Sequence, residues 1–206
     1  MMHINMRFIG ITGGVGAGKS AILSYLAKKP KTKVMLADEI AHDLMEPGTE
    51  CYREIVARFA DEDILMSDGS FDRGRLAQVI FSDVTKREAM NAIVHPAVKE
   101  YVRQQYALEL QKGELELLIL EAALLIEEEY DEICDELWYI YTNEQNRRNR
   151  LKESRGYSDE KIDNIFKSQL SENEFRESTQ VTIDNNGDLE ETYQQIEQAL
   201  RRKADE

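Results

Sequence analysis

Cysteine, long apolar runs and a basic excess are all missing from this sequence. Its 206 residues include only Cys51 and Cys134, which lack the close spacing of metal ligands, so we expect two reduced thiols. No apolar stretch approaches the length of a membrane-spanning helix. Residues 1–6 hold neither a basic start nor an apolar segment of the secretory type, so no secretory signal is expected. These absences favour a cytoplasmic protein without a membrane segment.

The charge balance is strongly acidic, with 26 basic against 40 acidic side chains and a formal net charge of −14. A general nucleic-acid binder usually carries a basic face, so this balance argues against one. Basic residues nevertheless gather at 147–155, which holds one acidic residue and the cations Arg147, Arg148, Arg150, Lys152 and Arg155. A polyanionic ligand would therefore be held locally, by a few placed cations. The acidic run at 127–132 fits a solvated surface and receives no function.

One glycine-rich segment is the most informative part of the chain. Residues 13–20 read Gly-Gly-Val-Gly-Ala-Gly-Lys-Ser, a complete G-x-x-x-x-G-K-S loop between an apolar run and a helical pattern. Glycines let main-chain N–H groups curl around phosphate oxygens, and the following helix directs its N-terminal dipole at the same anion. Lys19 would reach the terminal phosphates and Ser20 would hold Mg²⁺. The alternative is a flexible turn with an incidental Lys-Ser pair, but strand, loop and helix signals agree on a nucleoside triphosphate site.

Apolar and amphipathic segments alternate along the chain. We expect strands at 7–12, 32–36, 115–120, 137–141 and 181–184. Helices are expected from the loop to about 28, from 38 to before Pro47, and at 50–59, 144–155, 158–170 and 189–202. The helical region at 73–111 is expected to break at 81–83 and at His95-Pro96. This alternation predicts an α/β fold of three layers around a central parallel sheet.

The residues that follow two expected strands favour one class of P-loop protein. No guanine-reading N-K-x-D segment is present, which argues against a GTPase. Asp38 follows the second strand, where it could accept a proton from an attacking hydroxyl or act only as a helix N-cap. Glu121 follows the third strand. It could be a partner of Mg²⁺ and its waters, or it could simply be the end of an ordinary strand. Leu124 and Leu125 would then line an acceptor pocket.

The basic helix at 144–155 is the third such feature. Its position after a strand in the second half of the chain suits a lid over ATP, where arginines would neutralise charge on the γ-phosphoryl group. A solvated basic helix is the alternative. Together with Asp38 and Glu121, this helix indicates a small-molecule kinase.

These motifs together resemble the dephospho-coenzyme A kinase family over about residues 7–200. The resemblance rests on segments that begin with residues 11–20 and continue through 37–38, 46–48, 72–73, 91–96, 123–127, 150–151, 155–156 and 183–187. It implies ATP-dependent phosphorylation of the ribose 3′-hydroxyl of dephospho-CoA, the last step of coenzyme A biosynthesis, with Mg²⁺. The chain departs from the family at Leu36, where an acid is usual, at Ala123, where proline is usual, and at Ala21, where threonine is usual.

The resemblance also implies roles for individual residues. Asp38 is the expected base on the 3′-hydroxyl, and Lys19 and Arg150 complete the catalytic set. ATP is expected to contact Gly14, Val15, Gly16, Ala17, Gly18, Lys19, Ser20, Ala21, Arg150, Arg155 and Asn185. The acceptor is expected to contact Thr12, Asp38, Arg73, His95 and Leu124. Mg²⁺ is expected on Ser20, with Glu121 in support.

We expect a single P-loop kinase domain over residues 1–206. Its core would be 7–37, 113–143 and 178–206, with a helical CoA-binding region at about 38–112 and a lid at about 144–177. The expected partners are ATP and dephospho-CoA, with no nucleic acid or membrane, and the chain is expected to be a monomer or weak homo-oligomer.

Two other functions stay open from the sequence. A nucleoside or nucleoside-monophosphate kinase would share the core and differ in its acceptor pocket. An ATP-hydrolysing regulator would signal to a protein partner instead of phosphorylating a small molecule. His95 could be a substrate contact or a polar residue at a helix break, and the sequence leaves both open. His42 is expected at the surface.

Overall fold

The computed structural model describes residues 6–202, and these fall into two compact units. The first runs up to Met35 and resumes at Glu109, and the second is Leu36–Leu108. The segment 1–5, which belongs to the region searched for a secretory signal, lies outside the described residues. Among the helices that the structure describes, none has the length and apolar character needed to cross a membrane.

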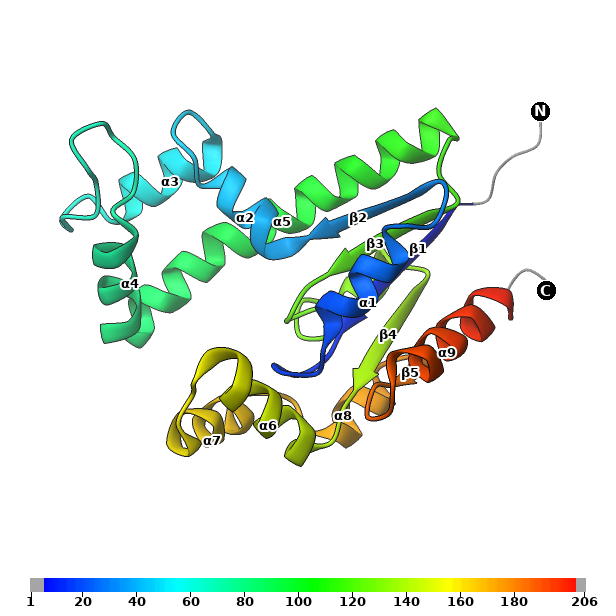
Figure 1. Ribbon diagram of the computed structural model, residues 1–206. Helices are drawn as coiled ribbons and strands as arrows, with labels where there is room; N and C mark the ends of the chain where they lie inside the picture. Colours follow the sequence, from blue (N-terminus) through cyan, green and yellow to red (C-terminus); the bar gives the residue numbers. More distant parts are fainter. Residues whose placement is uncertain (1–5, 203–206) are drawn as a thin grey trace. The chain divides into compact units, whose positions relative to one another are not determined.

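A five-stranded sheet forms the centre of the first unit (Figure 1). Its strands lie in the order β2-β3-β1-β4-β5, with bounds β1 Arg7–Thr12, β2 Thr32–Leu36, β3 Leu117–Glu121, β4 Glu136–Tyr141 and β5 Val181–Asp184. β1 pairs in parallel with both β3 and β4, and β4 pairs in parallel with β5. The predicted parallel sheet is therefore confirmed, and β1 is its central strand.

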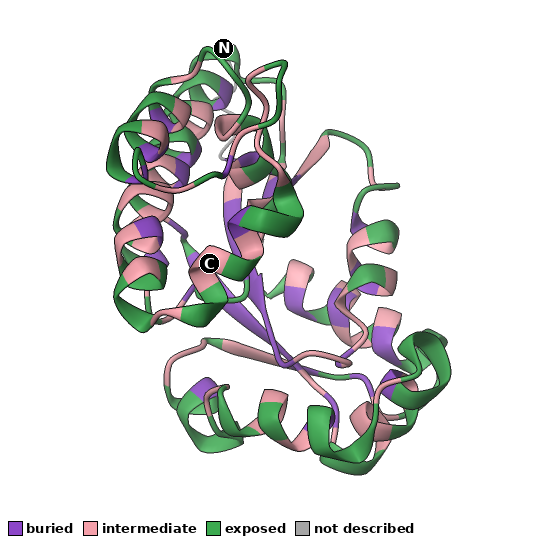
Figure 2. Cartoon of the chain, turned by 90° about the vertical axis from the view of Figure 1, so that its left-hand side faces the viewer, coloured by how far each residue is buried: buried purple, intermediate pink, exposed green. Residues whose placement is uncertain are grey.

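The strands are apolar because both of their faces are covered. On one face, side chains of four strands pack with helices α1 (Lys19–Leu26) and α9 (Leu189–Arg201). That cluster consists of Ile9, Ile11, Ile119, Trp138, Ile140 and Ile183 from the strands, with Ile22, Leu26, Ile196 and Ala199 from the helices. The alternate residues Phe8, Leu118 and Leu120 are equally buried, so the sheet is the most buried part of this unit (Figure 2).

Three more helices of this unit follow β4. α6 is Glu144–Arg155, α7 is Asp159–Lys167 and α8 is Glu172–Glu177. The single helix expected at 158–170 is thus shorter, and α8 was not predicted. Ser171 explains the new helix, because its hydroxyl accepts from the Glu174 N–H while the Glu174 side chain returns to the Ser171 N–H. This capping box starts α8 within a few residues of the end of α7.

The second unit is helical, with α2 (Ala37–Leu44), α3 (Glu50–Arg58), α4 (Arg73–Ser82) and most of α5 (Val84–Lys112). It has its own apolar core of Cys51, Ile55, Phe59, Ile64, Leu76 and Met90. Cys51 and Cys134 are both free and buried, and burial raises the pKa of Cys134 to about 12. Both cysteines are therefore packing residues rather than reactive thiols.

The predicted helix break at His95-Pro96 is wrong, because α5 continues through Pro96. Proline removes one main-chain N–H, and the exposed ring of Pro96 lies on the outer side of the helix. Met90, Val98 and Val102 are buried, and the half-buried Val94 packs against the core that contains Met90. These four residues recur every fourth position on one face, and their burial on both sides of Pro96 favours an unbroken helix.

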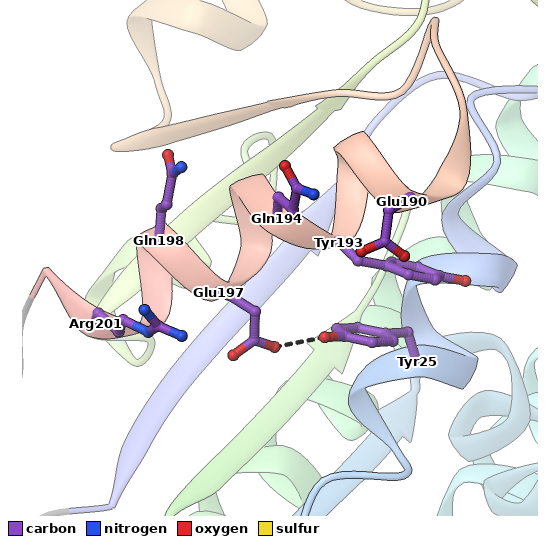
Figure 3. A pocket seen from close by; sticks show the side chains of 7 residues that line it. All are labelled: Tyr25, Glu190, Tyr193, Gln194, Glu197, Gln198 and Arg201. Carbon is purple, nitrogen blue, oxygen red and sulfur yellow. Dashed lines mark hydrogen bonds between the residues drawn. The ribbon is translucent and has the colours of Figure 1, made fainter.

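α1 and α9 also meet through a polar and aromatic contact at the surface (Figure 3). The rings of Tyr25 and Tyr193 stack with centroids 3.9 Å apart, and the Tyr25 hydroxyl donates to Glu197 Oε1 at 2.6 Å. Lys29 donates to the same carboxylate oxygen. The hydrogen bond to Glu197, followed by burial, raises the pKa of Tyr25 to about 12, so the neutral phenol is favoured by folding.

This contact predicts a pH-dependent stability difference between the wild type and Tyr25→Phe. The folded pKa of Tyr25 lies above its ordinary value of 10.0, so its contribution is complete below pH 10 and is lost as the pH rises towards 12. We expect the variant to lower the free energy of unfolding by about 1 kcal/mol at pH 8, since one hydrogen bond is lost. Urea unfolding followed by circular dichroism should show this difference shrinking between pH 10 and 11.5.

Tyr193→Phe is the matched control, because it removes a hydroxyl from the other stacked ring and keeps the Tyr25–Glu197 bond. A difference between wild type and Tyr25→Phe that stayed constant up to pH 11.5 would contradict the assignment.

Candidate active site

The glycine-rich loop joins β1 to α1. Gly16 and Gly18 have φ values of 84° and 86°, in the left-handed region that side chains disfavour, so glycine is required at both positions. Gly18 is the N-cap of α1 and provides no side-chain cap. Main-chain N–H groups at the start of α1, together with those of the loop, can therefore form a site for an anion.

The side chain of Lys19 contacts the start of this loop and the end of β3. Its Nζ donates to the Gly13 carbonyl at 2.7 Å and lies 3.4 Å from Glu121 Oε1. The two side chains are only 15% and 18% exposed, so their charges interact more strongly than a surface pair would. The last residue of β3 thus positions the predicted phosphate-binding ammonium group, and the structure brings Lys19 and Glu121 together as two of the expected site residues.

A second cluster ties the loop to the ends of β4 and β5. The Ala17 carbonyl accepts from Thr142 Oγ1 at 3.0 Å, from Arg150 Nη1 at 3.2 Å and from Asn185 Nδ2 at 2.7 Å. Arg150 Nη2 also donates to the Asn185 carbonyl at 2.8 Å. Thr142 and Asn185 are buried, so these bonds are shielded from water. Of the expected ATP residues, the loop, Arg150 and Asn185 are therefore contiguous.

The oxygen atoms near Lys19 suit a magnesium ion. Ser20 is exposed in the first turn of α1, and Glu121 supplies a carboxylate one strand away. The described part of the chain contains no group of three or more His, Cys, Asp or Glu side chains arranged to hold a metal. Mg²⁺ in kinases takes one or two protein oxygens and fills its other positions with phosphate and water, so Ser20 with Glu121 fits that ion.

Two expected acceptor contacts fall in the first unit. Thr12 is fully buried at the end of β1, and among the described residues its Oγ1 has no hydrogen-bond partner. Leu124 is 40% exposed, whereas Leu125 is fully buried next to Gly10. The expectation that Leu125 lines a pocket is therefore wrong, because its side chain belongs to the core beneath β1. Leu124 stays available at the surface.

The remaining expected acceptor residues lie in the second unit. Asp38 is the second residue of α2 and is exposed, while Leu36 is the N-cap, so the helix-cap alternative for Asp38 is excluded. Arg73 begins α4, and its Nη2 lies 2.6 Å from His42 Nε2. His42 is thus an exposed residue with a defined partner. His95 lies inside α5 and is half-buried, not at a helix break.

The arginines of the basic helix differ in their surroundings. Arg155 is exposed at the end of α6, with its guanidinium 5.8 Å from the Tyr157 ring. Arg147, which the sequence did not single out, instead bonds to the Val15 carbonyl of the loop, and Gln169 bonds to the Val15 N–H. The basic run at 147–155 could have pointed to Arg147. Nothing in the sequence marks Gln169.

Comparison with known proteins identifies one family. A family model described as dephospho-CoA kinase matches residues 7–191. Dephospho-CoA kinase of Shouchella clausii is 36% identical over 198 residues, which is 96% of this chain and 99% of that relative.

Two solved structures share the fold. The Thermus thermophilus protein TT1252 superposes with a TM-score of 0.74 at 28% identity, covering 95% of this chain and 97% of that one. Dephospho-CoA kinase from Campylobacter jejuni superposes with a TM-score of 0.70 at 19% identity, covering 94% and 95%. The fold is therefore that of the P-loop kinases, as predicted.

The cluster around Ala17 predicts a large effect of Arg150→Ala on stability. The change leaves the buried Thr142 and Asn185 oxygens without a charged donor, so we expect the free energy of unfolding to fall by about 2 kcal/mol. Urea unfolding at pH 7.5 measures it. Arg155→Ala, on the same helix but exposed, should change the free energy of unfolding by less than about 0.5 kcal/mol. Equal effects of the two substitutions would show that the cluster does not hold the loop.

Proposed function

Since the chain belongs to the dephospho-CoA kinase family, we propose that it transfers the γ-phosphoryl group of ATP to the ribose 3′-hydroxyl of dephospho-CoA. The observation that carries the proposal is a phosphate loop with an engaged lysine, in a chain that matches this family almost from end to end. The product would be coenzyme A, and ADP would leave. The geometry of the loop supports the donor, and the family match supports the acceptor.

ATP would bind with its phosphates along residues 14–21, on main-chain N–H groups that the loop does not already use, whereas the N–H groups of Val15 and Ala17 donate to Gln169 and to the Gly14 carbonyl. Lys19 would contact the β- and γ-phosphates, because its Nζ already lies at the mouth of the loop on the Gly13 carbonyl. Asn185 would lie towards the nucleoside end and Arg150 towards the transferred phosphoryl group, and both are bonded to the Ala17 carbonyl of the loop. Arg155 would join ATP from the exposed end of α6.

Mg²⁺ would be held by the Ser20 hydroxyl, with Glu121 bonded to its waters. Once bound, the ion would neutralise charge on the phosphate oxygens and polarise the phosphorus. Glu121 would then have two roles, because the same carboxylate orients Lys19.

The acceptor would bind the helical region at 38–112 and present its 3′-hydroxyl to Asp38. Asp38 comes two residues after β2, and ligands of parallel α/β sheets bind beyond the carboxyl ends of the strands, which supports this role. Its exposed carboxylate is not used as a helix cap. The family resemblance also assigns acceptor contacts to Arg73 and His95 in this unit and to Thr12 and Leu124 in the first.

The transfer would be a direct in-line displacement. The 3′-hydroxyl oxygen forms a bond to the γ-phosphorus while the bond from that phosphorus to the β–γ bridging oxygen breaks. The hydroxyl proton passes to the Asp38 carboxylate, and the electron pair of the broken bond leaves on ADP. Lys19 and Arg150 would stabilise the charge that develops on the transferred phosphoryl group and on the oxygen that leaves with ADP.

Acceptor identity can be tested by product mass. The purified chain is incubated with Mg·ATP and, separately, with dephospho-CoA, AMP, adenosine and no acceptor. We expect one added phosphoryl group on dephospho-CoA only, and phosphorus NMR should place it on the ribose 3′ position. A dephospho-CoA analogue that lacks the 3′-hydroxyl is the matched control and should give no product.

Other results of this assay would identify the other candidate functions. Phosphorylated AMP or adenosine would indicate a nucleotide or nucleoside kinase. ADP release that is equally fast without any acceptor would indicate an ATP-hydrolysing regulator.

Asp38→Asn tests the proposed base. The amide cannot accept the proton, so we expect kcat to fall by a factor on the order of 10²–10⁴ while the Kd of Mg·ATP stays within twofold. Initial rates with dephospho-CoA and calorimetric titration with Mg·ATP measure the two quantities. Asp43→Asn, which changes another exposed acid of α2, is the control and should keep full activity. Turnover of Asp38→Asn within threefold of the wild type would rule Asp38 out as the base.

A further inference from the structure

The main-chain N–H and carbonyl groups of Val15, in the phosphate loop, are both hydrogen-bonded to side chains from distant segments. The Val15 N–H donates to Gln169 Oε1 at 3.3 Å, and the Val15 carbonyl accepts from Arg147 Nε at 2.9 Å. Arg147 Nη2 also donates to Gln169 Oε1, which closes a ring of three hydrogen bonds. We call this ring of Val15, Arg147 and Gln169 the Val15 clasp.

Arg147 is half-buried, and within residues 6–202 no acidic side chain forms a salt bridge with it. Its guanidinium carbon lies 4.2 Å from the Phe166 ring centre, and its hydrogen bonds go to neutral oxygens. The neighbouring Arg148, in contrast, pairs with Glu144, Asp159 and Asp163. Burial lowers the pKa of Arg147, and the charge of the nearby Glu144 offsets this cost only in part. Such a residue beside a phosphate loop is a candidate for function.

Gly14 adds an independent sign that the position of Arg147 matters. Its φ is not among the positive values of the described glycines, so its backbone would accept any residue. A Cβ on Gly14 would instead overlap the Arg147 guanidinium. A side chain at position 14 would therefore displace the Arg147 guanidinium from the place that it occupies.

We infer that Arg147 and Gln169 are positioning residues for the phosphate loop. By fixing both main-chain groups of Val15, the clasp holds the loop in the conformation that turns the N–H groups of Gly16 and of residues 18–20 towards phosphate. The loop is then preorganised, and nucleotide binding does not have to order it. The inference rests on the ATP site of the proposed function but not on its acceptor, so nucleotide binding alone tests it.

Arg147 is suited to the clasp by its shape as well as by its charge. Nε and Nη2 donate at the same time to two different acceptors, which the single ammonium group of lysine cannot reproduce. A clasp therefore predicts that Arg147→Lys behaves like Arg147→Ala. A role for Arg147 as a charge on the transferred phosphoryl group predicts instead that lysine largely rescues alanine.

The first experiment measures the Kd of Mg·ATP and Mg·ADP by calorimetry and kcat at saturating ATP. For Arg147→Lys, Arg147→Ala and Gln169→Ala, we expect the Kd of both nucleotides to rise about tenfold, as it would if about a tenth of the loops were competent. Because bound nucleotide restores the loop, kcat should stay within about threefold of the wild type. Lys152→Ala, which changes a cation of α6 that pairs with Asp159, is the control and should leave the Kd unchanged.

Two results would overturn the inference. One is an unchanged nucleotide Kd for Arg147→Ala and Gln169→Ala, with only the free energy of unfolding reduced, which would make the clasp purely structural. The other is a hundredfold fall in kcat for Arg147→Ala that Arg147→Lys rescues, which would make Arg147 a catalytic charge. If nucleotides bind as expected but dephospho-CoA is not phosphorylated, the clasp stands and the proposed acceptor fails.

A double variant tests the link to Gly14. Gly14→Ala should displace Arg147 and raise the Kd of Mg·ATP by about the same tenfold. In the Arg147→Ala background the space is open, so the added methyl group should raise the Kd by less than a further threefold. If the two effects multiply fully, Gly14 is required by the phosphate and not by Arg147, and this part of the inference is wrong.

Discussion

A loop that turns its N–H groups inward to hold phosphate must turn its carbonyl groups outward, and these need partners. In this chain alternate carbonyls of the loop each meet a side chain. The Gly13 carbonyl accepts from Lys19, the Val15 carbonyl from Arg147, and the Ala17 carbonyl from Thr142, Arg150 and Asn185. Only Lys19 comes from the loop itself. The inward face of the loop is thus formed by its own glycines, while its outward face is fixed mostly by the second half of the chain.

The order of the sheet explains how such distant residues reach the loop. β1 lies between β3 and β4, and β5 lies beyond β4, so the ends of β3, β4 and β5 all open near the loop that follows β1. Glu121 comes from the first of these ends, Thr142 and α6 from the second, and Asn185 from the third. The cations of the basic run at 147–155 fall into two groups. Arg147 and Arg150 face the loop, while Arg148 and Lys152 pair with acids of α7, so a chain of charge −14 still presents local cations to an anion.

Local patterns in the sequence predicted the strands and the loop because their causes are local. An apolar run between turn signals gives a buried strand, and β1, β2 and β5 begin and end where expected. The break at Pro96 failed because burial of Met90, Val98 and Val102 along one face outweighs the loss of one hydrogen bond. The role of Gln169 could not be predicted from the sequence for a different reason. A glutamine has no characteristic spacing, and its role exists only once α7 ends beside Val15.

The two units also differ in what a substitution can change. The nucleotide site draws all of its described contacts from the first unit, and the second has a separate core around Ile55 and Leu76. The proposed acceptor residues of the second unit, such as Arg73 and His95, can therefore vary without loss of the interactions that hold the loop. Changes in the first unit are different. Any change at Arg147, Arg150 or Asn185 alters a carbonyl partner of the loop, and hence the affinity for every nucleotide regardless of the acceptor.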